Sequence, residues 1–142
     1  MTTVLKTLTD TTYDSIEGYR KAAEKADSPQ LKQALNDRLR QREQTLATMN
    51  AALQRKGGEL VTKGTVTGDL HRMWLGITDA FESGDAAAAE RVEEGEDYLK
   101  AKFEAALDND DLDPADRTVI EQCYAEICEV ERFGDMISQQ YD

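Results

Sequence analysis

Apolar side chains recur at steps of three and four residues along most of this chain, and that spacing constrains the fold more than any other feature. Such a repeat places apolar side chains on one face of an α-helix. It runs through residues 3–26, 29–56 and 85–107, and from residue 114 nearly to the C-terminus. The chain has only two prolines, and no stretch alternates in the way a strand does. The sequence therefore predicts an all-α protein.

Short turns separate the first helix from the second and the third from the fourth. Ser28 and Asp113 each stand directly before a proline. A capping residue followed by proline is typical of a helix start, because proline has no N–H to lose at the first helical position. Gly57 and Gly58 end the second stretch. Because short turns join antiparallel neighbours, each pair of helices is predicted to form a hairpin.

A longer connection joins the second and third long helices. Residues 58–68, GELVTKGTVTG, have three glycines, three threonines and no helical period, which predicts an extended segment. Eleven extended residues span at most about 36–40 Å, close to the length of such a bundle. A short helix over residues 69–83 follows. The prediction is a ferritin-like antiparallel four-helix bundle with one long crossover containing a short extra helix, and an up-down-up-down bundle is the alternative.

Chain length and charge limit the kinds of protein this can be. A chain of 142 residues suffices for one core, so residues 1–142 are predicted to form a single four-helix-bundle domain. Lys and Arg number 17 against 29 Asp and Glu, and the net charge of -12 repels phosphate backbones and anionic lipids. We expect neither nucleic acid nor membrane as a partner, which leaves a homodimer or another protein. With no long apolar run and no secretory signal pattern, a cytoplasmic location is expected.

Each long helix carries one glutamate on or beside its apolar stripe. These residues are Glu17, Glu43, Glu96 and Glu131. An ionised carboxylate is rarely buried without a partner. At a rise of 1.5 Å per residue, all four come to about 15–22 Å from one end of a crossover bundle. Carboxylates from four helices hold two cations in di-iron and di-manganese bundles. The four glutamates are therefore candidate ligands for a divalent metal such as Fe, Mn or Mg.

Two features of the sequence oppose this metal hypothesis. Di-iron bundles use Glu-x-x-His pairs, and the only histidine here is His71, outside the long helices. The nearest substitutes are Glu-x-x-Glu pairs such as Glu93 with Glu96, and all-oxygen ligands favour Mg²⁺, Ca²⁺ or Mn²⁺. Arg42 is the second feature, because it is predicted on an inner face where its guanidinium would neutralise carboxylates. A buried ion-pair network and solvated glutamates are the alternatives to a metal site.

The other chemically distinctive side chains are predicted to be structural. Cys123 and Cys128 are five residues apart on a helix and point about 140° away from each other, so they form neither a disulfide nor a CxxC motif. We expect small core or boundary residues there. Trp74 is predicted to close the end of the core beside His71, with an exposed recognition or metal corner as the alternative. No catalytic motif is present, so no enzyme class is assigned.

Several segments together give the sequence a family resemblance. They are IEGYRKAAE at 16–24, the double glycine after the second helix, GDLHRMW at 68–74 and EEGEDYLKAKFEAAL at 93–107. Over nearly the whole chain they resemble an uncharacterised proteobacterial family of ferritin-like four-helix-bundle proteins, a domain of unknown function. The resemblance implies a ferritin-like fold and a bacterial cytoplasmic setting, and related proteins are often linked to stress responses.

The same resemblance shows where this chain departs from its family. Family members carry a histidine where this chain has Glu131, and a glutamine where it has Cys123. Those departures weaken a histidine-assisted metal site. We therefore predict a non-enzymatic stress-related or interaction module, with a carboxylate-rich divalent-metal-binding protein as the alternative.

Overall fold

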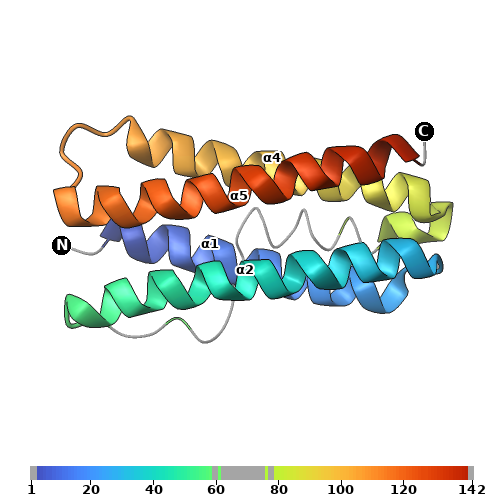
Figure 1. Ribbon diagram of the computed structural model, residues 1–142, viewed down its shortest axis with the longest axis horizontal. Helices are drawn as coiled ribbons and strands as arrows, with labels where there is room; N and C mark the ends of the chain where they lie inside the picture. Colours follow the sequence, from blue (N-terminus) through green and yellow to red (C-terminus); the bar gives the residue numbers. More distant parts are fainter. Residues whose placement is uncertain (1–2, 59–60, 62–75, 77–78, 141–142) are drawn as a thin grey trace.

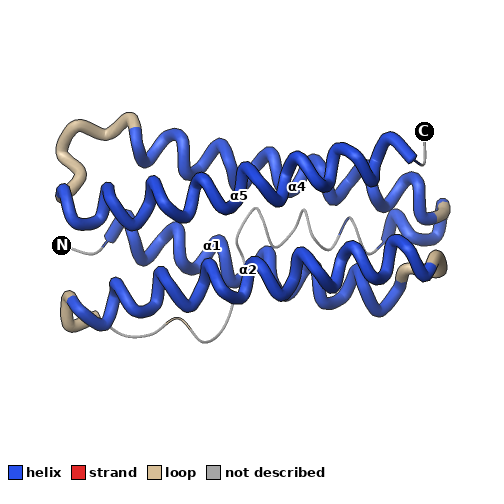
Figure 2. The backbone as a smooth tube through the Cα atoms, in the orientation of Figure 1, coloured by secondary structure: helices blue, strands red, loops and turns tan. Residues whose placement is uncertain are grey.

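The computed structural model describes residues 3–58, 61, 76 and 79–140, and for residues 3 and 130–140 it gives the backbone alone. The described part contains helices and no strand. The elements are α1 (Thr3–Lys25), α2 (Pro29–Arg55), the 3₁₀-helix η1 (Phe81–Ser83), α4 (Asp85–Leu107) and α5 (Pro114–Gln140) (Figure 1, Figure 2). The all-α prediction is confirmed. The four long helices begin and end within a residue or so of their predicted bounds.

Both ends of α2 follow from local sequence. The Ser28 Oγ accepts a hydrogen bond from the Leu31 amide at 3.3 Å, which confirms the predicted cap. At the other end, Gly57 has φ 81°, a conformation that glycine adopts without strain. The Gly58 amide then donates to the Leu53 carbonyl at 2.9 Å. Together with the bond from the Gly57 amide to the Gln54 carbonyl at 2.9 Å, this bond forms a Schellman motif, which satisfies carbonyls that have no partner within the helix.

Helix directions reveal how the two hairpins are connected. Helices α1 and α2 form one antiparallel hairpin, and α4 and α5 form the other (Figure 1). Helix α4 begins beside the turn where α2 also begins, because the Asp85 carboxylate accepts hydrogen bonds from the Asp27 amide at 3.2 Å and the Ser28 amide at 2.7 Å. Helices α2 and α4 therefore run in the same direction. The chain between them has to return along the bundle, which is the crossover arrangement and not up-down-up-down.

Val61, early in the crossover, is fixed to α2 by two hydrogen bonds. The Asn50 side chain of α2 binds both backbone polar groups of Val61, accepting from its amide at 2.8 Å and donating to its carbonyl at 3.1 Å. Val61 is buried. Most of the short helix predicted over residues 69–83, with Trp74 and His71, lies outside the described residues. No helix in the described part is long and apolar enough to cross a membrane.

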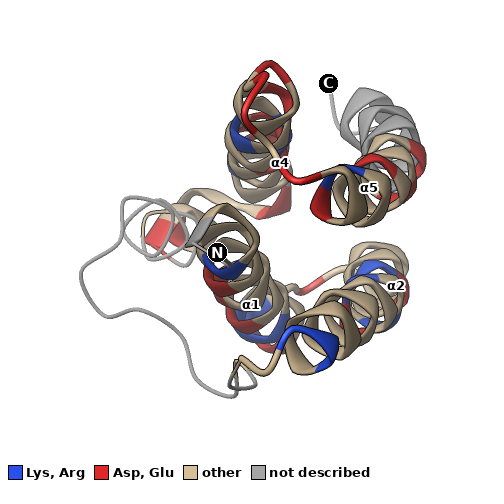
Figure 3. Ribbon diagram, turned by 90° about the vertical axis from the view of Figure 1, so that its left-hand side faces the viewer, with Lys and Arg blue, Asp and Glu red and all other residues tan. Residues whose placement is uncertain are grey.

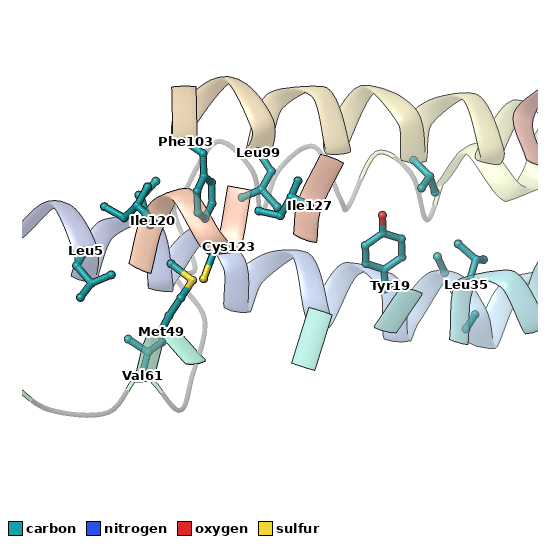
Figure 4. Packing of buried hydrophobic residues seen from close by; sticks show 14 of the residues in the cluster. Leu5, Tyr19, Leu35, Met49, Val61, Leu99, Phe103, Ile120, Cys123 and Ile127 are labelled. Carbon is teal, nitrogen blue, oxygen red and sulfur yellow. The ribbon is translucent and has the colours of Figure 1, made fainter. Parts of the chain in front are cut away.

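The four helices surround one core. Helix α1 packs beside α2 and α4, and α5 packs beside α2 and α4 (Figure 3). Toward one end, the core is filled by the fully buried side chains of Leu5, Met49, Phe103, Ile120 and Cys123 (Figure 4). Full burial of an apolar side chain of this size stabilises the fold by about 1.5–3 kcal/mol. Further along, the Tyr19 ring lies in the same interior (Figure 4).

Candidate functional site

A pair of opposite charges lies in the middle of the bundle with no exposure to solvent. Arg42 of α2 donates from Nη2 to Oε2 of Glu96 on α4 at 2.7 Å, and both side chains are 0% exposed. Arg42 Nη1 donates to the Ser15 Oγ of α1 at 2.9 Å. Hydrogen bonds to charged groups contribute about 1.5–3 kcal/mol each, roughly twice the neutral value. One guanidinium thus connects three of the four helices.

A second ion pair lies one turn further along the same helices. Arg38 donates from Nη2 to Oε1 of Glu93 at 3.1 Å, with the two side chains 4% and 15% exposed. Its Nη1 donates to the Tyr19 hydroxyl at 3.2 Å. The Arg38 and Arg42 guanidinium carbons lie 5.7 and 5.6 Å from the Tyr19 ring centre, within range of a cation–π contact. Two cations and two carboxylates give the cluster no net charge.

Helical spacing brings these six side chains together. Arg38 and Arg42 are four residues apart, as are Ser15 and Tyr19, and Glu93 and Glu96 are three apart. Side chains at these separations lie on the same face, one turn apart. We call the set the central network. Its members are Ser15, Tyr19, Arg38, Arg42, Glu93 and Glu96.

Ionisation in the central network follows from the close contact of opposite charges. Burial opposes the charge on Glu96, but the charge and hydrogen bond of Arg42 outweigh it and hold the pKa of Glu96 below its ordinary value. Burial likewise opposes the charge on Arg42, and Glu96 nevertheless raises the pKa of Arg42. Burial raises the pKa of Tyr19 well above its ordinary value. At neutral pH the pair is therefore ionised and the tyrosine is neutral.

The space beside the central network is small. A cavity of about 10 Å³ lies between α2 and α4. Its lining residues are Leu31, Ala34, Leu35, Arg38, Ala89, Val92 and Glu93. A volume of roughly 10–15 Å³ is the least that holds one water molecule. The cavity is thus the size of a water molecule and not of a substrate.

Three of the four predicted glutamates have side chains that the structure describes, and these three do not meet in the core. Of the three glutamates whose side chains the structure describes, Glu96 alone is in the core; Glu43 is exposed, and Glu17 is half-buried and pairs with Arg20 at 2.5 Å on the surface. Each of these two follows an inner residue directly in sequence, and one residue turns a helix by 100°, away from the core. The Glu131 side chain lies outside the described residues. Among described residues, no three His, Cys, Asp or Glu side chains are grouped as a metal would require. Binding of a divalent cation stays a prediction.

Sequence reasoning identified Arg42 and Glu96 as inner residues but missed most of their surroundings. Arg38, Tyr19 and Ser15 were not among the candidate site residues, and Glu93 was considered only as a metal ligand. The signal was present, because Arg38 lies one turn before Arg42 on the stripe that includes Leu35. Arginine is so seldom fully buried that its place on an apolar stripe is easily discounted.

The two thiols of α5 differ in environment. Cys123 is fully buried, and burial raises its pKa to about 12. Cys128 is half-buried, and both cysteines are free. A thiol of such high pKa carries almost no thiolate at neutral pH and is neither a nucleophile nor a ready metal ligand. The expectation that Cys123 is a core residue is confirmed.

Fold and central network define an all-α bundle of four helices with an ion-pair cluster in its interior. The family described as Domain of unknown function (DUF2383) matches residues 1–109, and the chain belongs to that family. The match includes every residue of the central network, whereas α5 lies beyond it. Neither a curated protein nor a solved structure matches the chain.

Proposed function

We propose that this chain is a ferritin-like bundle that neutralises its interior carboxylates with its own arginines and acts as a non-enzymatic interaction module. The Arg42–Glu96 pair is the observation that carries the proposal. Bundles of the di-iron class use interior glutamates to bind cations. Here the interior glutamate already has a cation, fully buried and hydrogen-bonded, from the same chain.

Charge repulsion supports this proposal over a metal site. A divalent ion beside Glu96 would face the guanidinium groups of Arg42 and Arg38 in the same small volume. Two unit charges of like sign 4 Å apart repel by about 4 kcal/mol at the effective dielectric constant of a protein, and a divalent ion doubles this. A metal could bind only after Arg42 had moved away from Glu96.

Metal analysis tests the proposal directly. We expect protein purified without chelator to contain no stoichiometric metal. Its Tm should be unchanged when Mn²⁺, Fe²⁺ or Mg²⁺ is added. A ligand that binds only the folded state must raise the Tm, so a reproducible rise would overturn the proposal in favour of the carboxylate metal site. Glu96→Gln and the exposed Glu43→Gln are the matched variants. A rise that Glu96→Gln abolishes and Glu43→Gln keeps would place the metal in the interior.

Protein association is the other half of the proposal. The net charge of -12 favours a protein partner over nucleic acid or an anionic membrane. Light scattering across a wide range of concentrations should show a mass above that of the monomer, or mixing with a cell extract should reveal one defined partner. A chain that stays strictly monomeric and binds no protein from the extract would contradict the proposal of an interaction module. A stress-related role and a cytoplasmic location stay predictions from the family resemblance.

A further inference from the structure

The two hairpins of the bundle carry opposite charge. Residues 3–58, with α1 and α2, contain ten Lys and Arg against seven Asp and Glu, a net charge of +3. Residues 85–140, with α4 and α5, contain five Lys and Arg against seventeen Asp and Glu, a net charge of -12. In Figure 3, acidic residues are coloured red on α4, on the turn that follows it and on α5. The acidity of the chain is therefore a property of one hairpin.

Ion pairs between the hairpins follow the same polarity. Arg38 and Arg42 of α2 pair with Glu93 and Glu96 of α4. Near the other end of the bundle, Lys56 pairs with Asp113 and, at 2.7 Å, with the buried Asp116 of α5. In each pair the cation belongs to the first hairpin and the carboxylate to the second.

Hydrogen bonds from uncharged donors of the first hairpin add to this pattern. The Thr45 hydroxyl donates to Glu126 of α5 at 2.8 Å. At the turn of the first hairpin, the Asp27 and Ser28 amides donate to the Asp85 carboxylate. Here too the acceptor is a carboxylate of the second hairpin. The second hairpin thus presents acceptors that the first hairpin matches with donors.

Pairing of like hairpins is disfavoured by these charges. Two first hairpins packed together would bury Arg38 and Arg42 against the same arginines, and two second hairpins would bury Glu93 and Glu96 against the same glutamates. Buried charges without an opposite partner are strongly destabilising. The surface that each hairpin presents to the core therefore selects the unlike hairpin, by repulsion as well as by attraction.

We propose that the partner this surface fits is the unlike hairpin of a second copy of the chain, so that two copies dimerise by exchanging their α4–α5 hairpins. The proposal rests on the proposed function, because it names the partner of the interaction module. Each half of the dimer then contains the first hairpin of one copy and the second hairpin of the other. All contacts between hairpins form again across the two copies, and exchange of an identical element is a low-cost route to a dimer.

The chain's connectivity is compatible with such an exchange. Each hairpin is closed by its own short turn and packs most extensively within itself. The two hairpins are joined through residues 56–84, a length of chain that already has to pass from one end of the bundle to the other. Exchange leaves both hairpins whole and changes only which copy supplies the second one.

Cross-linking between the hairpins tests the exchange. Lys56→Cys and Asp113→Cys place two partly exposed thiols at a contact between the hairpins, and Cys128→Ala removes the accessible native thiol. Copies with normal and heavy isotopes are unfolded together, refolded at high concentration and separated by size. The dimer fraction is then treated with a short bis-maleimide and analysed by denaturing mass spectrometry. The two variants with a single added cysteine are the controls.

Hairpin exchange predicts covalent dimers, doubling the mass, of which about half contain one light and one heavy chain if the copies pair at random. Neither single-cysteine control should give them. A dimer fraction with cross-links only inside single chains would overturn the exchange while leaving the interaction module intact, because the copies would then associate through outer surfaces. Absence of any dimer up to roughly millimolar protein would also overturn it. The metal analysis above decides the proposed function separately.

Discussion

Two neighbouring parts of one core are built from opposite kinds of side chain. Around Phe103, Ile120 and Cys123 the interior is apolar, and its side chains are fully buried (Figure 4). Around Arg42 and Glu96 it is charged, and these side chains are equally buried. The apolar part gains stability from burial of each side chain separately. In the charged part, burial of each group is unfavourable by itself and becomes tolerable only through its partner.

This difference determines how each part responds to change. Apolar packing is non-directional, so a slightly smaller side chain loses only its own contacts and leaves a small void. A buried ion pair fixes which helix faces which, because only one register brings the guanidinium to the carboxylate. Such a pair is weak evidence for stability and better evidence for specificity. We infer that the apolar part supplies most of the folding free energy and the central network selects the arrangement of the hairpins.

The largest expected effect comes from removing one member of the buried pair. Arg42→Met should lower the free energy of unfolding by about 3–5 kcal/mol, because it leaves the Glu96 carboxyl group in the core without its hydrogen-bonded cation. Urea denaturation at pH 7 measures it. Arg40→Met is the matched control, because Arg40 pairs with Asp37 on the same helix while 67% exposed, and such surface pairs contribute about 0–1 kcal/mol.

The double variant Arg42→Met with Glu96→Leu sharpens the same comparison. Replacing both charges with apolar groups removes the unpaired carboxylate, so most of the lost stability should return. If Arg42→Met cost no more than Arg40→Met, the two parts of the core would not differ in the way described here.

Acid should weaken the charged part of the core selectively. The pKa of Glu96 is lower in the folded protein than the value of about 4.3 in an unfolded chain, because Arg42 favours the carboxylate. Stability from this shift is fully present above about pH 4.3 and is lost as the pH falls through the folded pKa. Unfolding free energies from pH 7 to pH 3 should therefore fall more steeply in the wild type than in Glu96→Gln. Parallel curves would show that Glu96 contributes nothing to the acid response.

A conservative change in the apolar part should have a small effect. Ile127 is fully buried, and Ile127→Val removes a single methylene. We expect a loss of about 0.5–1.5 kcal/mol in urea denaturation, with the native circular dichroism spectrum unchanged. A loss as large as that of Arg42→Met would mean that the apolar part is as intolerant of change as the charged part.

The sequence predicts the helices well because the signals are local. Ser28 caps α2 by accepting from the amide three residues further on, and Gly57 ends the same helix within a single turn. The charged site is different, since Arg42 and Glu96 are 54 residues apart in the chain. A helical period indicates which residues face inward, but it does not say which inward residues meet. Glu43 shows the limit of the period itself, because one step along the helix from Arg42 is enough to reach solvent.

The smallest effect concerns reactivity rather than stability. Cys123 lies in the apolar part with a pKa of about 12, whereas Cys128, five residues later on α5, is half-buried. At pH 8 the Cys123 thiol is almost entirely protonated, and the thiolate is the reactive form. A thiol reagent such as DTNB should modify Cys128 first and reach Cys123 only as the protein unfolds. In Cys128→Ser the early phase should vanish and the slow phase should follow global unfolding in urea. Equal rates for both thiols in the native protein would show that the apolar part opens to solvent without unfolding. The apolar and charged parts of the core would then differ in dynamics as well as in chemistry.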